Sequence, residues 1–215
     1  MNKFITVQEA VDKVHDGMTI MVGGFLAVGT PEAVIDGLVA KGVKNLTRIS
    51  NDTAYTTKGV GKMIVNHQIK KLIVSHIGTN EETINQMNSG ELEVEFSPQG
   101  TLAERIRTGG AGLGGVLTPT GLGTVVEEGK QKLTIDGKEY LLEKPLHADV
   151  ALIGANISDE DGNLIYKGTS QNFCPLMATA ADVVIVEPQE IVKTGTIAHE
   201  AVKTQGIFVD YIVKK

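Results

Sequence analysis

The stretch Asp16-Gly-Met-Thr-Ile-Met-Val-Gly-Gly-Phe-Leu-Ala-Val-Gly-Thr-Pro31 decides how this chain folds. Its first two residues predict a turn, and Met18 to Val22 predict a buried strand. Gly23 and Gly24 follow at the carboxyl end of that strand, and the closing Thr-Pro pair opens a helix. In an open α/β sheet, ligands bind in the crevice beyond the strand ends. Two residues without a Cβ would let a ligand approach main-chain N–H groups there.

The rest of the chain continues this alternation of strands and helices. Strands are expected at residues 46–50, 71–75, 92–96, 149–154, 182–187 and 207–213. Helices are expected at residues 7–16, 31–41, 79–89, 101–108 and 172–181, the first of them opened by a capping box, Thr6-Val-Gln-Glu9. Alternation at this spacing predicts βαβ units, and hence an α/β fold with an open, mostly parallel sheet and helices on both faces.

The alternation breaks at residue 109. Residues 109–123 hold seven glycines and one proline, too many for a regular helix or strand. Residues 132–135 and 139–142 then flank Asp136-Gly137, a strong hairpin signal. We therefore expect a single domain over residues 1–215, with a Gly-rich loop and a β-hairpin inserted at about residues 109–145.

The composition fits this fold and excludes several functions. Hydrophobic residues make up 41% of the 215, but aromatics only 4%, so aliphatic side chains must fill the core. The net charge of −6 offers no basic surface for nucleic acid, and no run of 18 apolar residues predicts a membrane span. Cys174 is the only cysteine, and the N-terminal residues lack a signal-peptide core. Both features favour the cytoplasm.

Gln99 is the main candidate for catalysis. It lies in Ser97-Pro-Gln-Gly-Thr101, directly after an expected strand. Pro98 cannot pair within a ladder, so the chain must leave the sheet and project the Gln99 amide into the crevice. A side-chain amide can stabilise developing negative charge without a proton transfer. The alternative is that Gln99 only caps the following helix.

Other candidates carry weaker signals. Asn51 and Asp52 end another strand, where such pairs commonly form Asx turns. Gly110, Gly112 and Gly115 fit the spacing of a dinucleotide-binding loop, but a helix pattern precedes them where a strand is required, so we reject that interpretation.

The five histidines are scattered without ligand spacing, which predicts no metal site. Cys174 lies in an apolar helix and is expected to act as a small buried hydrophobe.

The segment Asp16–Pro31 closely resembles the signature of the family I coenzyme A transferases, α subunit. The similarity covers essentially the whole chain and is also tight at Asn51–Thr53, Ser75–Asn80, Pro98–Arg107 and Gly109–Glu128. It is greatest to bacterial two-subunit enzymes that act on acetoacetate with acetate or butyrate. The resemblance implies reversible transfer of CoA, as a substrate and with no cofactor, between a short-chain acyl-CoA and a short-chain carboxylate.

In this family a glutamate carboxylate attacks the acyl-CoA and carries CoA as a glutamyl thioester. That glutamate lies in a Ser-Glu-Asn-Gly motif, which this sequence lacks. The resemblance therefore implies that a β subunit supplies the nucleophile, usually in an α2β2 assembly. It makes Gln99 an oxyanion-hole residue. The residues it places against CoA or substrate are Gly23, Gly24, Phe25, Asn51, Gly109, Gly110 and Gly112.

Two other functions remain open at this point. A sugar-phosphate isomerase on a related fold would need a phosphate nest and a local general base, and the crevice motifs contain no convincing base. A non-catalytic ligand-binding domain would never meet a catalytic partner.

Overall fold

A mostly parallel β-sheet forms the centre of the computed structural model, which describes residues 3–214. Within those residues the main sheet has nine strands. Eight run in the order β1-β12-β11-β9-β2-β3-β4-β5, and β10 pairs with β9. Their bounds are β1 (Phe4–Thr6), β2 (Thr19–Val22), β3 (Leu46–Ile49), β4 (Ile69–Val74), β5 (Glu93–Phe96), β9 (Ala148–Asp159), β10 (Leu164–Ile165), β11 (Ala181–Val192) and β12 (Tyr211–Lys214).

The strand directions confirm the expected sheet. All neighbours along the eight-strand path pair in parallel, and β10 is antiparallel to β9. From β2 the chain proceeds to β3 on one side, whereas from β9 it proceeds toward β11 on the other. The connections thus diverge beside β2, the position in open α/β sheets where the carboxyl ends of the strands form a ligand crevice.

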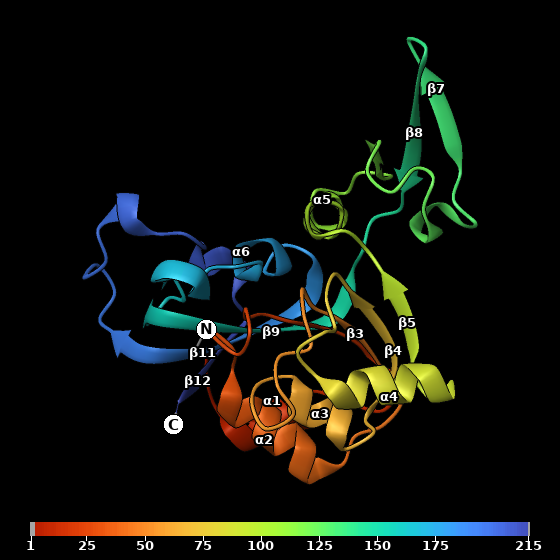
Figure 1. The fold of residues 1–215 in the computed structure, drawn as a ribbon. Coiled ribbons are helices and arrows are strands. Elements are labelled where there is room, and N and C mark those ends of the chain that lie inside the picture. Colours follow the sequence, from red (N-terminus) through yellow and green to blue (C-terminus); the bar gives the residue numbers. More distant parts are fainter. Residues whose placement is uncertain (1–2, 215) are drawn as a thin grey trace.

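Helices cover both faces of this sheet, as expected (Figure 1). On one face lie α1 (Val7–Asp12), α2 (Glu32–Lys41), α3 (Gly61–Val65) and α4 (Glu81–Ser89), and on the other α5 (Gln99–Gly110) and α6 (Cys174–Met177). Strand β2 contributes side chains to the hydrophobic cores on both faces of the sheet, because alternate side chains of a strand point to opposite faces. Ile20 and Val22 join the core under α1–α4, and Met21 joins the core under α5 and α6.

Local signals set several helix ends as expected. The capping box is present at α1, where Glu9 N donates to Thr6 Oγ1 at 3.2 Å and Thr6 N donates to Glu9 Oε2 at 2.7 Å. Helices α2 and α4 end at Gly42 and Gly90.

Other elements differ from the expectation. Phe4–Thr6 forms β1, a strand that was not expected; it pairs with β12 from the far end of the chain and leads directly into α1. Helix α3 was not expected, and α6 is shorter than residues 172–181. Strands β9 and β11 run past residues 154 and 187 because their second halves pair with each other. Pro188 fits in β11 because β12 pairs only with Ile185 and Val186, which leaves an open edge.

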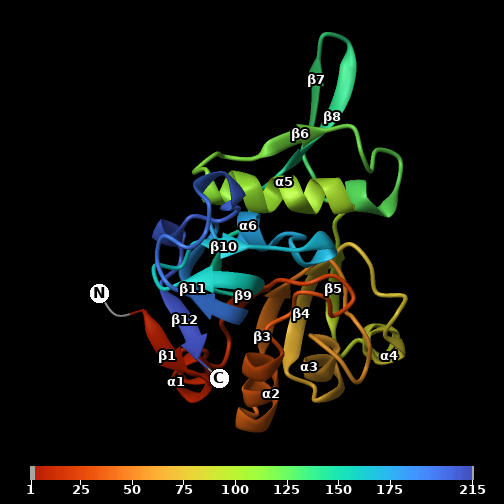
Figure 2. The ribbon, with the colours of Figure 1, turned by 90° about the vertical axis from the view of Figure 1, so that its left-hand side faces the viewer.

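The inserted region forms an arm, residues 116–143, that projects from the body (Figures 1 and 2). It contains a three-stranded antiparallel sheet in the order β6-β8-β7 and a short 3-10 helix, η1. Their bounds are β6 (Val116–Thr118), η1 (Val125–Glu127), β7 (Lys132–Ile135) and β8 (Lys138–Glu143). The hairpin prediction is confirmed: Asp136 (φ 50°) and Gly137 (φ 75°) make the tight turn between β7 and β8.

An ion-pair cluster anchors the arm to the body. The buried Glu143 of β8 contacts Lys130 Nζ at 2.6 Å and lies 3.8 Å from Arg105 Nε of α5. Arg105 also donates from Nη1 to Glu95 of β5 at 2.8 Å. No helix within residues 3–214 is long and apolar enough to cross a membrane.

Candidate active site at the carboxyl ends of the strands

Four neighbouring parallel strands, β2 to β5, end at the same edge of the sheet, and most of the candidate residues follow these strand ends. Gly23 follows β2, Asn51 lies just after β3, Ser75 follows β4, and Gln99 lies just after β5. Backbone pairing continues past the strand ends, since Ser75 N donates to Asn51 O at 3.1 Å. This part of the site therefore rests on the rigid edge of the sheet.

Gln99 is the first residue of α5 and is exposed at this edge. Pro98 takes the chain out of the sheet, as predicted, and occupies the N-cap position without a side-chain cap. The Gln99 side chain does not cap the helix either: its Oε1 accepts a hydrogen bond from the Ser75 hydroxyl. No group within residues 3–214 accepts from Gln99 Nε2, so the amide can donate into the crevice.

The Gly23-Gly24 turn is shaped by packing, which corrects one expectation. The Gly23 N–H is not free to face the crevice, because it donates to Leu152 O at 2.9 Å. A Cβ on Gly23 would collide with the Cys174 sulfur. Gly24 has φ 121°, and a Cβ there would collide with Thr30. Contact of Gly23 and Gly24 with CoA or substrate therefore cannot use the Gly23 N–H, and that contact remains a prediction.

Cys174 lies under this turn and is buried, as expected. Burial raises the pKa of its thiol to about 12, although hydrogen bonding by neighbouring backbone groups opposes the shift. The thiol is therefore protonated at neutral pH and unsuited to nucleophilic attack. Its sulfur packs closely against Gly23.

Asp52 fixes the two loops that rise from β2 and β3. Its carboxylate accepts from Ala54 N at 2.8 Å, which confirms the Asx turn, and from Leu26 N at 3.0 Å. Leu26 (φ 47°), Ala27 (φ 70°) and Ala54 (φ 49°) all adopt left-handed backbone, which costs on the order of 1 kcal/mol each and needs support from the surroundings. Asp52 provides part of that support.

Arg48 lies fully buried beneath these loops. It donates from Nη1 to Val60 O at 2.9 Å. Burial lowers its pKa to about 10, while the charge of Asp52 opposes the shift. The guanidinium therefore stays charged at neutral pH and complements the Asp52 carboxylate.

The rims of the two loops are apolar and solvent-facing. Phe25 is 39% exposed and Tyr55 43% exposed. The loops touch, because a Cβ on Gly59 would contact that of Ala27. Phe25 thus lies at the rim of the crevice, where contact with a substrate stays a prediction, as it does for the buried Asn51.

Gly109, Gly110 and Gly112 lie apart from this group, and their contact with CoA or substrate remains a prediction. Gly109 and Gly110 end α5, about 15 Å along its axis from Gln99. Cβ atoms there would collide with Leu146 O and Thr179 respectively.

The arm returns toward the site further along. Thr118 and Thr120 lie beside Gly100 and Thr101 at the start of α5, around a cavity of about 320 Å³. Residues of the Gly-rich region thus lie near the start of α5, the helix that begins at Gln99.

Three glutamates, Glu187, Glu104 and Glu127, are engaged in structural contacts. Glu187 accepts from Ala33 N at 3.2 Å and from Val34 N at 3.1 Å, and so caps α2. Glu104 pairs with Arg107 at 2.8 Å. Glu127 pairs with Lys132 and accepts from Gly123 N.

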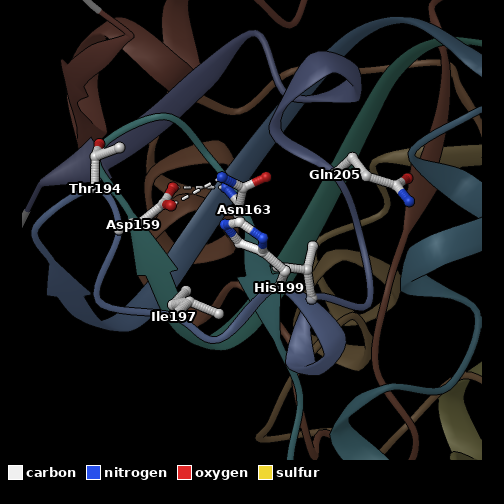
Figure 3. A pocket seen from close by; sticks show the side chains of 8 residues that line it. Asp159, Asn163, Thr194, Ile197, His199 and Gln205 are labelled. Atoms are coloured by element: carbon white, nitrogen blue, oxygen red, sulfur yellow. Dashed lines mark hydrogen bonds between the residues drawn. The ribbon is translucent and has the colours of Figure 1, made fainter.

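A second cavity of about 320 Å³ lies at the far ends of β9 and β11 (Figure 3). Asp159, Asn163, Thr194, His199 and Gln205 are among its lining residues. The buried Asp159 carboxylate accepts from Asn163 N and Nδ2, both at 2.8 Å, and from Asp161 N at 3.1 Å. These hydrogen bonds give Asp159 a structural role in the turn at residues 159–163. Among residues 3–214, no three His, Cys, Asp or Glu side chains are grouped to hold a metal ion.

Sequence reasoning missed Ser75 and the contact between Cys174 and the glycine turn. The sequence shows Ser75 at the end of the expected strand 71–75, but its nearness to Asn51 and Gln99 follows from the order of the strands in the sheet. The Cys174 contact joins segments about 150 residues apart, and no local pattern announces it.

Comparison with known proteins places the chain in context. The family model described as coenzyme A transferase matches residues 4–215. The chain is 55% identical to the acetate CoA-transferase subunit alpha of Escherichia coli over 98% of this chain and 96% of that protein. It is 56% identical to the acetoacetyl-CoA:acetate/butyrate CoA transferase alpha subunit of Clostridium acetobutylicum over 100% of this chain and 98% of that protein.

The fold is shared with more distant proteins. An acyl-CoA transferase apoenzyme from Escherichia coli O157:H7 superposes with a TM-score of 0.86 at 23% sequence identity. The superposition covers 99% of this chain and 46% of that one, so this chain spans less than half of that larger polypeptide.

Proposed function

The chain belongs to the coenzyme A transferase family, and we propose that it is the α subunit of a two-subunit enzyme. This enzyme moves CoA reversibly between a short-chain acyl-CoA and a short-chain carboxylate, with acetoacetate, acetate and butyrate as the expected acyl groups. Matches to two α subunits over nearly their full lengths support this reaction class over the isomerase and the binding-domain alternatives.

One observation carries the proposed role of this chain. Gln99 is exposed at the edge of the sheet, its Oε1 accepts from Ser75, and no group within residues 3–214 accepts from its Nε2. An acyl carbonyl under attack develops negative charge on its oxygen, and a fixed N–H donor stabilises that charge more than the ground state. The chain therefore contributes an oxyanion donor.

The nucleophile has to come from another chain. The sequence has no Ser-Glu-Asn-Gly motif, and Glu187, Glu104 and Glu127 are engaged in structural contacts. We assign the attacking glutamate, and the glutamyl-CoA thioester, to a β subunit. An α2β2 assembly and a cytoplasmic location remain predictions, the latter supported by the single buried cysteine.

Reconstitution tests this proposal. The purified chain, its β partner and their mixture are each assayed for CoA transfer from acetoacetyl-CoA to acetate. Turnover only in the mixture is the expected result. Turnover by this chain alone, or none in a mixture that forms a stable complex, would contradict it.

A further inference from the structure

Ser75 stands between two acceptors at the candidate site. Its Oγ lies 2.6 Å from Asn51 O and also contacts Gln99 Oε1. Its main chain is fixed, because Ser75 N donates to Asn51 O at 3.1 Å and the next residue, His76, forms a parallel bridge with Asp52. The hydroxyl thus has a defined position from which to act on Gln99.

A hydroxyl has one proton, so Ser75 can fully satisfy only one of these acceptors at a time. If the proton goes to Gln99 Oε1, both N–H bonds of Nε2 face the crevice. If it goes to Asn51 O, Ser75 keeps only lone pairs for Gln99. The side-chain amide would then be flipped, so that it donates one N–H to Ser75 and presents its oxygen to the crevice.

The contacts of Asn51 favour the first arrangement. Asn51 O already accepts from Ser75 N, so it does not need the hydroxyl proton to be satisfied. Gln99 Oε1 has no other donor within residues 3–214. Donation to Gln99 therefore leaves neither oxygen without a partner.

We propose that Ser75 is a positioning residue that sets the orientation of the Gln99 amide, so that its N–H donors and not its oxygen face the reacting carbonyl. This inference rests on the proposed function for its catalytic consequence. An inverted amide would place a partial negative charge against the developing oxyanion, so losing Ser75 lowers kcat without removing Gln99.

Kinetics of the reconstituted complex test the consequence. We expect Ser75→Ala to lower kcat about 10-fold, roughly the worth of one neutral hydrogen bond, with KM within about twofold of wild type. Ser75→Thr, which keeps a hydroxyl, should restore most of kcat. In a Gln99→Ala background, adding Ser75→Ala should lower kcat by less than about a further twofold, because no amide is left to orient.

Ser97→Ala is the matched control. Ser97 occupies the equivalent position after β5, where its N donates to Val74 O at 2.9 Å and its buried hydroxyl has no hydrogen-bond partner within residues 3–214. This variant should keep wild-type turnover. Full turnover of Ser75→Ala, or an equal loss in both Gln99 backgrounds, would overturn the proposal.

A second measurement does not depend on turnover. Side-chain amide protons of ¹⁵N-glutamine-labelled chain are followed by exchange with water, and the Gln99 signals are identified by their absence in Gln99→Glu. Gln68 Nε2 donates to Leu38 O at 2.8 Å and to Val43 O at 3.0 Å, and so serves as the protected reference.

We expect both Gln99 protons to exchange at least about 10-fold faster than those of Gln68. One slow Gln99 proton that becomes fast in Ser75→Ala would show the inverted amide and overturn the proposal. If the complex lacks transferase activity while both Gln99 protons exchange fast, the proposed function fails and the orientation set by Ser75 stands.

Discussion

Both ends of helix α5 contain residues that the sequence predicted for the site, yet the two ends differ in what they do. The first end carries Gln99, which is exposed and bonded to Ser75 across the strand edge. The last end carries Gly109 and Gly110, which allow the helix to pack against Leu146 and Thr179. The Gln99 end presents a functional group, whereas the glycine end removes side chains so that two backbones can meet.

This difference separates two meanings of glycine near a binding site. Gly23 and Gly24 lie at the site, but they also have packing reasons, since Cβ atoms there would meet Cys174 and Thr30. A glycine cluster thus marks a close approach and does not reveal whether a ligand or the protein itself makes it. Substitutions along α5 can distinguish the two.

The largest expected effect is at the Gln99 end. Gln99→Ala in the reconstituted complex should lower kcat by about 10²–10³-fold, the usual cost of losing one oxyanion donor. The unfolding midpoint should remain within a degree or so of wild type, because the side chain is exposed. Steady-state kinetics and thermal unfolding measure both. Full turnover would remove Gln99 from the mechanism.

Gly109→Ala should show the opposite pattern. Its new methyl group would overlap Leu146 O, a backbone atom with little freedom to move, so we expect a loss of about 1–3 kcal/mol in the free energy of unfolding. The kcat of the folded complex should not change. Urea unfolding and active-site-normalised kinetics are the measurements.

Gly100→Ala is the control in the same helix. A Cβ at Gly100 meets nothing within 4 Å, so this variant should be neutral or more stable by about 0.5–1 kcal/mol. If Gly109→Ala were equally harmless, the packing explanation of the glycine end would be wrong.

A somewhat smaller, coupled effect is expected at the glycine turn. Gly23→Ala should cost about 1–3 kcal/mol of stability because its methyl group meets the Cys174 sulfur. In a Cys174→Ala background the same change should cost at least about 0.5 kcal/mol less. A double-mutant cycle by urea unfolding measures the coupling. If the free-energy changes of the two substitutions simply add, the predicted contact between Gly23 and the Cys174 sulfur is contradicted.

The smallest effect concerns the anchor of the arm. Burial pushes the pKa of Glu95 upward, but the hydrogen bond and charge of Arg105, helped by Lys71, bring it below 4.5. A lowered carboxyl pKa adds stability above pH 4.5 that is lost as pH falls through the folded-state pKa. Glu95→Gln should therefore flatten the stability-versus-pH curve below pH 4.5. An unchanged stability-versus-pH curve would mean that the Glu95–Arg105 ion pair does not contribute to the pH dependence of stability.

Local patterns predicted most of the fold, and long-range pairing accounts for what they missed. The Asp136-Gly137 hairpin and the Thr6 capping box follow from neighbouring residues alone. Strand β1 has three residues and exists because β12 lies beside it. Helix α3 begins at Gly61, a residue whose propensity argues against a helix.

The site was predictable to the same extent. Gln99 and Asp52 could be found because Pro98 and the Asx pattern fix the local backbone. The Ser75 contact depends on β4 lying between β3 and β5, which only the assembled sheet shows. The free N–H group expected at Gly23 was wrong because Leu152, distant in sequence, accepts its hydrogen bond.

The central claim is that this chain supplies the oxyanion donor and a partner chain supplies the nucleophile. Incubating the reconstituted complex with acetoacetyl-CoA alone, followed by rapid acid quenching and intact-mass spectrometry, tests it most directly. The account predicts a mass increase equal to one thioester-linked CoA on the partner chain and none on this chain. A CoA adduct on this chain would contradict it.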